Sequence, residues 1–151
     1  MTPQFKTKDV AKSSYSNYLK KADECFRAAQ NSFNSEEWNA SAINAIHCCI
    51  SACDSICVYF LGKRHSGEDH NDAAKLFQSV KNDEEVKTNA NRIMRILRTK
   101  NMAEYEERLV RKTEAEAILK DCERFFEYVK KQLGRDGWLE FLDEMNAFSV
   151  P

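Results

Sequence analysis

No proline interrupts this chain between its ends, because its two prolines are Pro3 and Pro151. Only four glycines occur among the 151 residues. Turns and β-hairpins depend on these two residue types, so their scarcity favours long helices joined by short connections. A chain of 151 residues has the length of one domain, and it can bury a core without a metal ion or a disulfide. We therefore expect one all-α domain.

Apolar residues recur at steps of three and four along several segments, which is the spacing of one buried helical face. One of them, 36–61, is apolar around most of its circumference and rich in small residues, as is typical of the central helix of a bundle. Short connections between such helices predict an antiparallel bundle of four to five helices. The helices are expected at 14–33, 36–61, 70–80, 82–99 and 113–133, with a last short one at 136–146.

Breaks in this periodicity predict where the helices end. Ser35 is the expected N-cap of the second helix, Gly62 its end, and Gly134 the end of the last long helix. The stretch 63–69 is expected to be a polar loop, and 100–108 a connector. The predicted organisation is a flexible N-terminal arm at 1–13, the helical bundle at 14–134, and a short C-terminal helix with a tail at 135–151.

Charge and hydropathy limit the classes of partner. The net charge is −1, so no global basic field attracts nucleic acid, and any RNA contact has to come from a local basic patch. No apolar run of about 18 residues is seen, so we expect no membrane span. Residues 1–12 are polar and lack the apolar core of a signal peptide. We therefore expect a cytoplasmic protein with reduced thiols.

The cysteines invite a metal interpretation, because Cys49, Cys53 and Cys57 share one helical stripe. A zinc site normally combines a Cys-x2-4-Cys turn with a second pair of ligands. Outside this helix only Cys25 and Cys122 remain, and they form no such pair. Free cysteine is also a common small core residue. Core packing is therefore favoured over metal binding, and we expect neither a metal ion nor a cofactor.

The loop after the second helix carries the candidate reactive pair. Arg64 and His70 stand at one helix junction, so their side chains can converge on one point. Cleaving RNA without metal needs a base for the 2′-hydroxyl proton, and histidine titrates in the right range. It also needs a cation for the charge that develops on the phosphate oxygens, which suits arginine. The start of the next helix adds free amides that favour phosphate. Alternatively, both residues are only capping and solvated groups.

A polar stripe follows the otherwise apolar second helix at steps of three and four. It consists of Asn44, His47, Ser51 and Asp54. The stripe is either the exposed edge of an ordinary amphipathic helix or, at Ser51 and Asp54, support for the loop that follows. Asn44 fits the first interpretation better, and the two interpretations of Asp54 are equally strong.

Two residues inside the loop are further supporting candidates. His65 is either a second titrating group or, as we favour, a solvent-facing loop residue, and Asp69 is expected to cap the third helix. Three residues elsewhere, His47, Lys100 and Tyr105, either contact substrate or a partner subunit, or are ordinary packing and solvated side chains.

The stretch 54–73, DSICVYFLGKRHSGEDHNDA, resembles the core of HEPN domains, whose signature is Arg-x4-6-His. Five residues separate Arg64 from His70, and the pair lies between the second and third predicted helices. The preceding helix, rich in Ala, Ile and Cys, is also similar, as is the downstream stretch from Lys100 to Tyr105. The resemblance covers roughly residues 18–133. The commoner family form has Asn or Asp directly after the arginine, where this chain has His65.

This resemblance implies properties that composition and spacing do not. HEPN domains generally form dimers in which two such loops face each other. Many are metal-independent ribonucleases of toxin–antitoxin, phage-defence or RNA-processing systems. By resemblance, Arg64 and His70 are the catalytic pair, and Asp54 holds one of them in place.

Three functions remain open on the sequence alone. The first is a metal-independent endoribonuclease that acts as a homodimer on RNA, with an antitoxin protein as a further partner. The second is a non-catalytic HEPN-like module that binds a nucleotide or a protein in the same dimer cleft. The third is a purely structural helical dimer.

Overall fold

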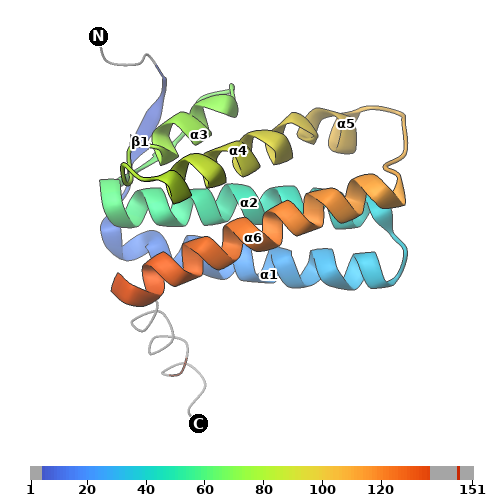
Figure 1. Ribbon diagram of the computed structural model, residues 1–151, viewed down its shortest axis with the longest axis horizontal. Coiled ribbons are helices and arrows are strands. Elements are labelled where there is room, and N and C mark those ends of the chain that lie inside the picture. The colour runs from blue at the N-terminus through green and yellow to red at the C-terminus, as the bar shows by residue number, and fades with distance from the viewer. Residues whose placement is uncertain (1–4, 137–145, 147–151) are drawn as a thin grey trace.

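The computed structural model describes residues 5–136 and residue 146. It is an all-α bundle, as predicted (Figure 1). The helix predicted at 136–146 lies outside the described residues apart from its two end positions. The helices are α1 (Tyr15–Asn34), α2 (Trp38–Leu61), α3 (Asn71–Phe77), α4 (Glu84–Arg98), α5 (Lys100–Tyr105) and α6 (Lys112–Asp136).

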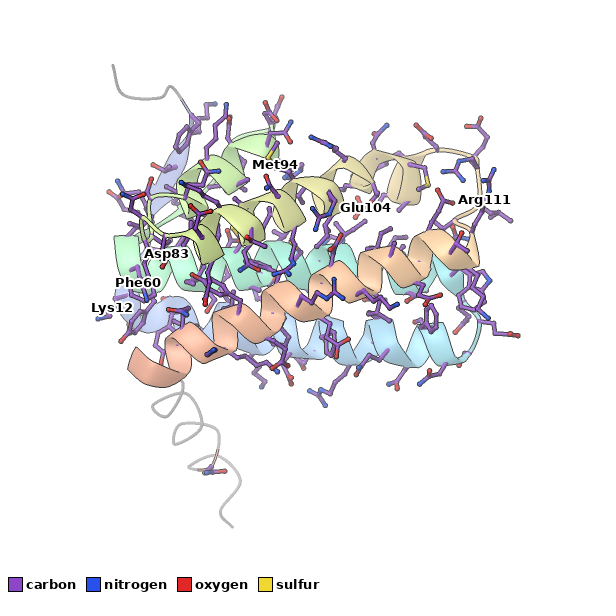
Figure 2. The ribbon with its side chains drawn as sticks, viewed as in Figure 1. Lys12, Phe60, Asp83, Met94, Glu104 and Arg111 are labelled. Atoms are coloured by element: carbon purple, nitrogen blue, oxygen red, sulfur yellow. The ribbon has the colours of Figure 1, made fainter. Side chains whose placement is uncertain are left out.

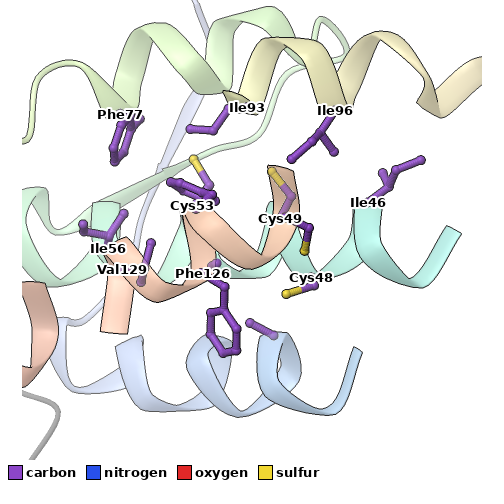
Figure 3. Close-up of a cluster of buried hydrophobic side chains, with 14 of the residues drawn as sticks. Ile46, Cys48, Cys49, Cys53, Ile56, Phe77, Ile93, Ile96, Phe126 and Val129 are labelled. Atoms are coloured by element: carbon purple, nitrogen blue, oxygen red, sulfur yellow. The ribbon is translucent and has the colours of Figure 1, made fainter. Parts of the chain in front are cut away.

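Helix α2 is the central element, in agreement with its small-residue, apolar pattern. It contacts α1, α6, α4, α3 and α5. Two buried serines join it to α1. The hydroxyl of Ser41 donates to the carbonyl of Ala29, and that of Ser55 donates to the carbonyl of Tyr15, both at a distance of 2.9 Å. Figure 3 shows Cys49 and other small α2 side chains among apolar groups of α3, α4 and α6. Small side chains on α2 let all these neighbours approach closely.

The expectation of no membrane span rested on the absence of a long apolar run, and that premise needs correction, because α2 contains an apolar window of 18 residues. The helix is long and apolar enough by composition to cross a membrane, with a mean hydropathy of 1.4 over its most apolar window. However, 56% of that window is buried inside the bundle. The other helices cover much of this apolar surface, as expected of the central helix of a bundle.

Of the three predicted helix ends, Gly62 is confirmed and Ser35 and Gly134 are wrong. Gly62 ends α2 in the left-handed conformation, at φ 68°. At the start of α4, the carboxylate of Asp83 caps the helix by accepting from the amide of Val86 at a distance of 2.9 Å. In contrast, Ser35 ends α1 rather than starting α2, because Glu36 takes φ 60° and turns the chain before Trp38. Gly134 does not stop α6, which continues to Asp136.

The first part of the chain differs from the predicted flexible arm. Strand β1 (Thr7–Asp9) pairs antiparallel with β2 (Lys63–His65), which occupies part of the predicted polar loop. A short 3-10 helix (Lys12–Ser14) then leads into α1. Phe5 and Val10, on either side of β1, pack against the core. This packing and the backbone ladder fix residues that their polar sequence suggested were loose.

The predicted connector at 100–108 is also more regular than expected. Its first part forms the short helix α5, in which Lys100 pairs with Glu104 one turn later over 3.0 Å. The amide of Ala103 donates to the carbonyl of Thr99 over 2.9 Å. Helix α5 packs against α2, and the side chain of Glu104, which belongs to α5, is labelled in Figure 2. The predicted connector therefore places side chains beside the second helix.

Candidate functional site

A cavity of about 170 Å³ lies where α2, β2, the loop before α3, and α4 meet. This space is large enough for several water molecules or a phosphate group. One part of its lining is apolar and comes from α2, α3 and α4, including Cys49, Ile93 and Leu97. The other part is polar. Its members are Asp54, Arg64, His65, Ser66 and His70.

Arg64 reaches the cavity from β2, where it pairs with Lys8 of β1. Its Nη1 donates to the backbone carbonyl of His65 at a distance of 3.0 Å. Pairing with β1 fixes the backbone, and this hydrogen bond restrains the half-buried guanidinium. A guanidinium has further donors in a planar fork that suits phosphate oxygens. Arg64 is therefore a held cation at the edge of a small cavity.

His65 is not the solvent-facing loop residue that we favoured from sequence. It stands opposite Thr7 in the two-stranded ladder, and only 9% of its surface is exposed. Its Nε2 is buried without a hydrogen-bond partner among the described residues. Burial lowers the pKa of His65, and the nearby His70 and Arg64 lower it too, while Asp72 and Asp69 oppose them.

His70 directly precedes α3 and faces the same cavity as His65. The centroids of the two imidazole rings are 6.2 Å apart. Burial lowers the pKa of His70, as does the charge of Lys100, while Glu104 and Asp69 oppose the shift. Both rings are therefore mainly neutral at neutral pH, and a neutral imidazole can accept a proton.

Asp54 lines the cavity from α2, and its burial raises the pKa of its carboxyl to about 7 against the opposing charges of Arg64 and Lys21. Within residues 5–136, the structure shows no hydrogen bond between Asp54 and either Arg64 or His70. The carbonyl of His65 is what orients Arg64. Asp54 therefore adds an acid that is about half protonated at neutral pH.

The three outlying candidates meet in one cluster beside the cavity. Nε2 of His47 lies 2.9 Å from one carboxylate oxygen of Glu104, and Nζ of Lys100 lies 3.0 Å from the other. The ammonium of Lys100 also lies 5.3 Å from the ring centroid of Tyr105. Burial raises the pKa of Glu104, but Lys100 and His47 outweigh it, so the net shift is downward. Lys100 and Glu104 both influence His70, which places this cluster next to the site.

Sequence reasoning named His47, Lys100 and Tyr105 but missed Glu104, the carboxylate that joins them. The i, i+4 spacing of Lys100 and Glu104 was the available signal, since such pairs face each other on a helix. That signal depends on a helix over residues that we expected to form a connector.

The remaining supporting candidates lie outside the cavity lining. Ser51 is half-buried on α2, one turn before Asp54. Asp69 was expected to cap the third helix, but α3 begins at Asn71 with His70 as its N-cap; Asp69 lies one residue earlier, and its carboxylate accepts from the amide of Asn71 at 3.0 Å. That contact also corrects the expectation that the start of the third helix offers free amides to a phosphate. The chain's own carboxylate already lies at the start of α3, a helix of seven residues, so this helix end is not a free phosphate site.

The thiols near the cavity have the environment of core residues. Burial raises the pKa of Cys49, and Cys53 has a raised pKa through the thiol of Cys57 and burial. Neutral, buried thiols are poor nucleophiles and poor metal ligands. Within the described ranges, no group of three or more His, Cys, Asp or Glu side chains is placed to hold a metal ion.

Fold and site together define a class: a helical bundle whose second and third helices meet at a cavity lined by arginine and histidine. The HEPN domain profile matches residues 15–132, which extend from the start of α1 into α6. The chain belongs to the HEPN domain family. A comparison with curated protein sequences returned no match.

Proposed function

We propose that this protein is a metal-independent endoribonuclease of the toxin or defence type, active as a homodimer. The observation that carries the proposal is that Arg64 and His70 line one cavity of about 170 Å³. Membership of the HEPN family, in which ribonucleases are frequent, supports the same conclusion. The free thiols fit a cytoplasmic protein, and an antitoxin protein is the partner expected of a toxin.

The reaction assigned to this cavity is attack of the RNA 2′-hydroxyl on the adjacent phosphorus. His70, with a pKa lowered by burial, takes the hydroxyl proton. The O2′–P bond forms, the P–O5′ bond breaks, and the 5′-oxygen receives a proton. The products are an RNA end with a 2′,3′-cyclic phosphate and one with a free 5′-hydroxyl.

Arg64 stabilises the charge that develops on the non-bridging oxygens during this attack. Its guanidinium is already oriented by the carbonyl of His65, so little reorganisation is needed when charge appears. Asp54 lies in the same cavity, and a fully ionised carboxylate there would repel a phosphate. With a pKa of about 7, Asp54 becomes neutral readily when an anion enters.

The purified protein is expected to cleave single-stranded RNA in the presence of EDTA, because none of the assigned steps needs a metal ion. DNA of the same sequence should remain intact, since it lacks the attacking 2′-hydroxyl. Mass spectrometry of the products should detect 2′,3′-cyclic phosphate ends. Cleavage that requires a divalent ion, or that also occurs in DNA, would contradict the proposal.

The homodimer is expected to form over the surface beside the cavity. Tyr105 and Leu109 each expose 72% of their area, and both are large apolar residues that the described fold leaves uncovered. Tyr105 belongs to the cluster next to His70. A second copy that covers these side chains would bring two cavities to one interface.

Replacing Tyr105 and Leu109 together by serine is expected to weaken the dimer by at least about tenfold, because each loses apolar contact area at the interface. Sedimentation velocity over a range of concentrations measures this change. The Lys20→Ser variant, on the exposed side of α1, is the control and should dimerise normally. An unchanged dissociation constant in the double variant would place the interface elsewhere.

The alternative function is a non-catalytic HEPN-like module that binds a nucleotide or a protein. The net charge of −1 and the small cavity favour it over an enzyme with an extended RNA interface. Such a module predicts that a nucleotide raises the melting temperature without being consumed. The EDTA assay separates the two functions directly.

A further inference from the structure

His65 contains a polar atom that the fold leaves unsatisfied. Its Nε2 is buried and has no hydrogen-bond partner among the described residues, and only 9% of the residue is exposed. A buried polar atom without a partner is unfavourable and rare in folded proteins. Since the ring also lines the cavity next to Arg64 and His70, a ligand there is the natural source of the missing interaction.

The backbone around His65 explains how such a ring is held in place. Thr7 pairs with His65 across the ladder, and the amide of Ser66 donates to the carbonyl of Lys6 over 3.0 Å. Gly67 leaves room for the ring, because a Cβ atom at this position would lie 3.2 Å from Nε2. The strand pairing therefore fixes the position of an imidazole whose own nitrogen it does not satisfy.

The two imidazoles of the cavity stand in a relation that suits one shared substrate. Their ring centroids are 6.2 Å apart and their planes are inclined by 59°. Rings at this separation do not stack tightly, and one phosphodiester can approach both of them. Arg64 lines the same space and provides the cation.

We propose that His65 is the second proton-transferring residue of the cleavage reaction, the general acid that protonates the departing 5′-oxygen. This inference rests on the proposed ribonuclease function. His70 removes the 2′-hydroxyl proton as the O2′–P bond forms. His65 gives its proton to O5′ as the P–O5′ bond breaks. Each turnover therefore moves one proton onto His70 and one off His65, and exchange with water restores both.

The charges around the two rings support this division of roles. His70 lies near the cation Lys100, which lowers its pKa, and near Glu104 and Asp69, which raise it. His65 lies near the carboxylates of Asp72 and Asp69, opposed by Arg64 and His70. Both rings are mainly neutral in the free protein, and the bound phosphodiester adds a negative charge that raises the share of protonated His65, the form that a general acid requires. Because the charge of Asp72 acts on His65 and that of Lys100 on His70, His65 is the better proton donor of the two.

A substrate with sulfur in place of the 5′-bridging oxygen tests the role of His65, because a thiolate leaves without being protonated. On ordinary RNA, His65→Asn is expected to be slower than wild type by at least about 100-fold. On the sulfur-bridged substrate, His65→Asn should approach the wild-type rate. His70→Asn should be slow on both substrates, since attack by the 2′-hydroxyl still needs a base.

Two results would overturn the assignment of His65 while leaving the ribonuclease proposal intact. One is an unchanged rate for His65→Asn on ordinary RNA. The other is an equal loss on both substrates with an unchanged melting temperature. A wild-type protein that cleaves neither substrate would instead remove the proposed function, and the role of His65 with it.

A measurement on the wild-type protein covers the case in which the His65 variants do not fold. The imidazole NMR signals of both His65 and His70 are expected to shift on titration with an uncleavable 2′-deoxy dinucleotide. The signal of His47, which lies outside the cavity lining, should shift less. A His70 signal that moves while that of His65 stays constant would overturn the proposal.

Discussion

Replacing His70 by alanine is expected to slow RNA cleavage by about 100- to 10,000-fold, the range measured for loss of a general acid or base. The ring lines the cavity that also holds Arg64, and burial keeps it in the neutral, proton-accepting form at neutral pH. The rate is measured under single-turnover conditions in EDTA, so that substrate release does not mask the chemical step.

The His70→Ala variant should fold normally, which makes its loss of activity interpretable. His70 is the N-cap of α3 but makes no side-chain capping bond, and the amide of Asn71 donates to the carboxylate of Asp69 instead. The ring is only partly buried, so its removal leaves no large cavity in the core. Melting temperature and circular dichroism should match the wild type closely.

Lys75→Ala is the matched control on the same short helix. The ammonium of Lys75 is exposed and pairs with Asp72 over 3.3 Å, a contact of small energetic value. This variant should cleave RNA at the wild-type rate. If His70→Ala also cleaves at that rate, the proposed catalytic pair is wrong, and the cavity would need another function.

The parts of this fold that the sequence predicted are those set by local periodicity. Apolar steps of three and four identify the helices that pack on α2, and the small residues of α2 identify it as central. Because Arg64 and His70 flank a junction between two such helices, their convergence on one cavity also followed from local signals. Family membership is confirmed independently over residues 15–132.

The parts that were missed depend on contacts between distant segments. Strands β1 and β2 have three residues each and join parts of the chain more than fifty residues apart, as in the pair Thr7 and His65. Three residues are too few for an alternating pattern to be visible. The burial of His65 is a consequence of that pairing, so the same missing signal hid both the strand and the second imidazole.

The replacement Asp54→Asn is expected to stabilise the protein at pH 8 and to change its stability little at pH 4. Burial raises the pKa of Asp54 from its ordinary 3.8 to about 7. Between these values the folded chain binds a proton that the unfolded chain has lost, so stability falls as pH rises through this window. Above about pH 7 the cost is complete, with an upper bound of roughly 4 kcal/mol.

Asparagine has almost the same shape as aspartate and never ionises, so the variant avoids this cost. The attraction of Arg64 and Lys21 is already included in the pKa of about 7, so the expected gain is the net cost of ionising Asp54 and cannot exceed that bound. For a chain of this size each kcal/mol corresponds to roughly 2–4 °C in Tm. Thermal unfolding of both proteins, followed from pH 4 to pH 8, measures the difference at each pH.

Asp23→Asn is the control for this experiment, because Asp23 is partly exposed on α1 and pairs with Arg27 in a surface ion pair. Its effect should stay below about 1 kcal/mol at every pH. If the Asp54→Asn and wild-type curves run parallel across the whole range, the carboxyl is not perturbed as the structure indicates. If stability rises above pH 7 while RNA cleavage falls, the chain keeps Asp54 for activity at the expense of stability, as is common for acids placed in catalytic cavities.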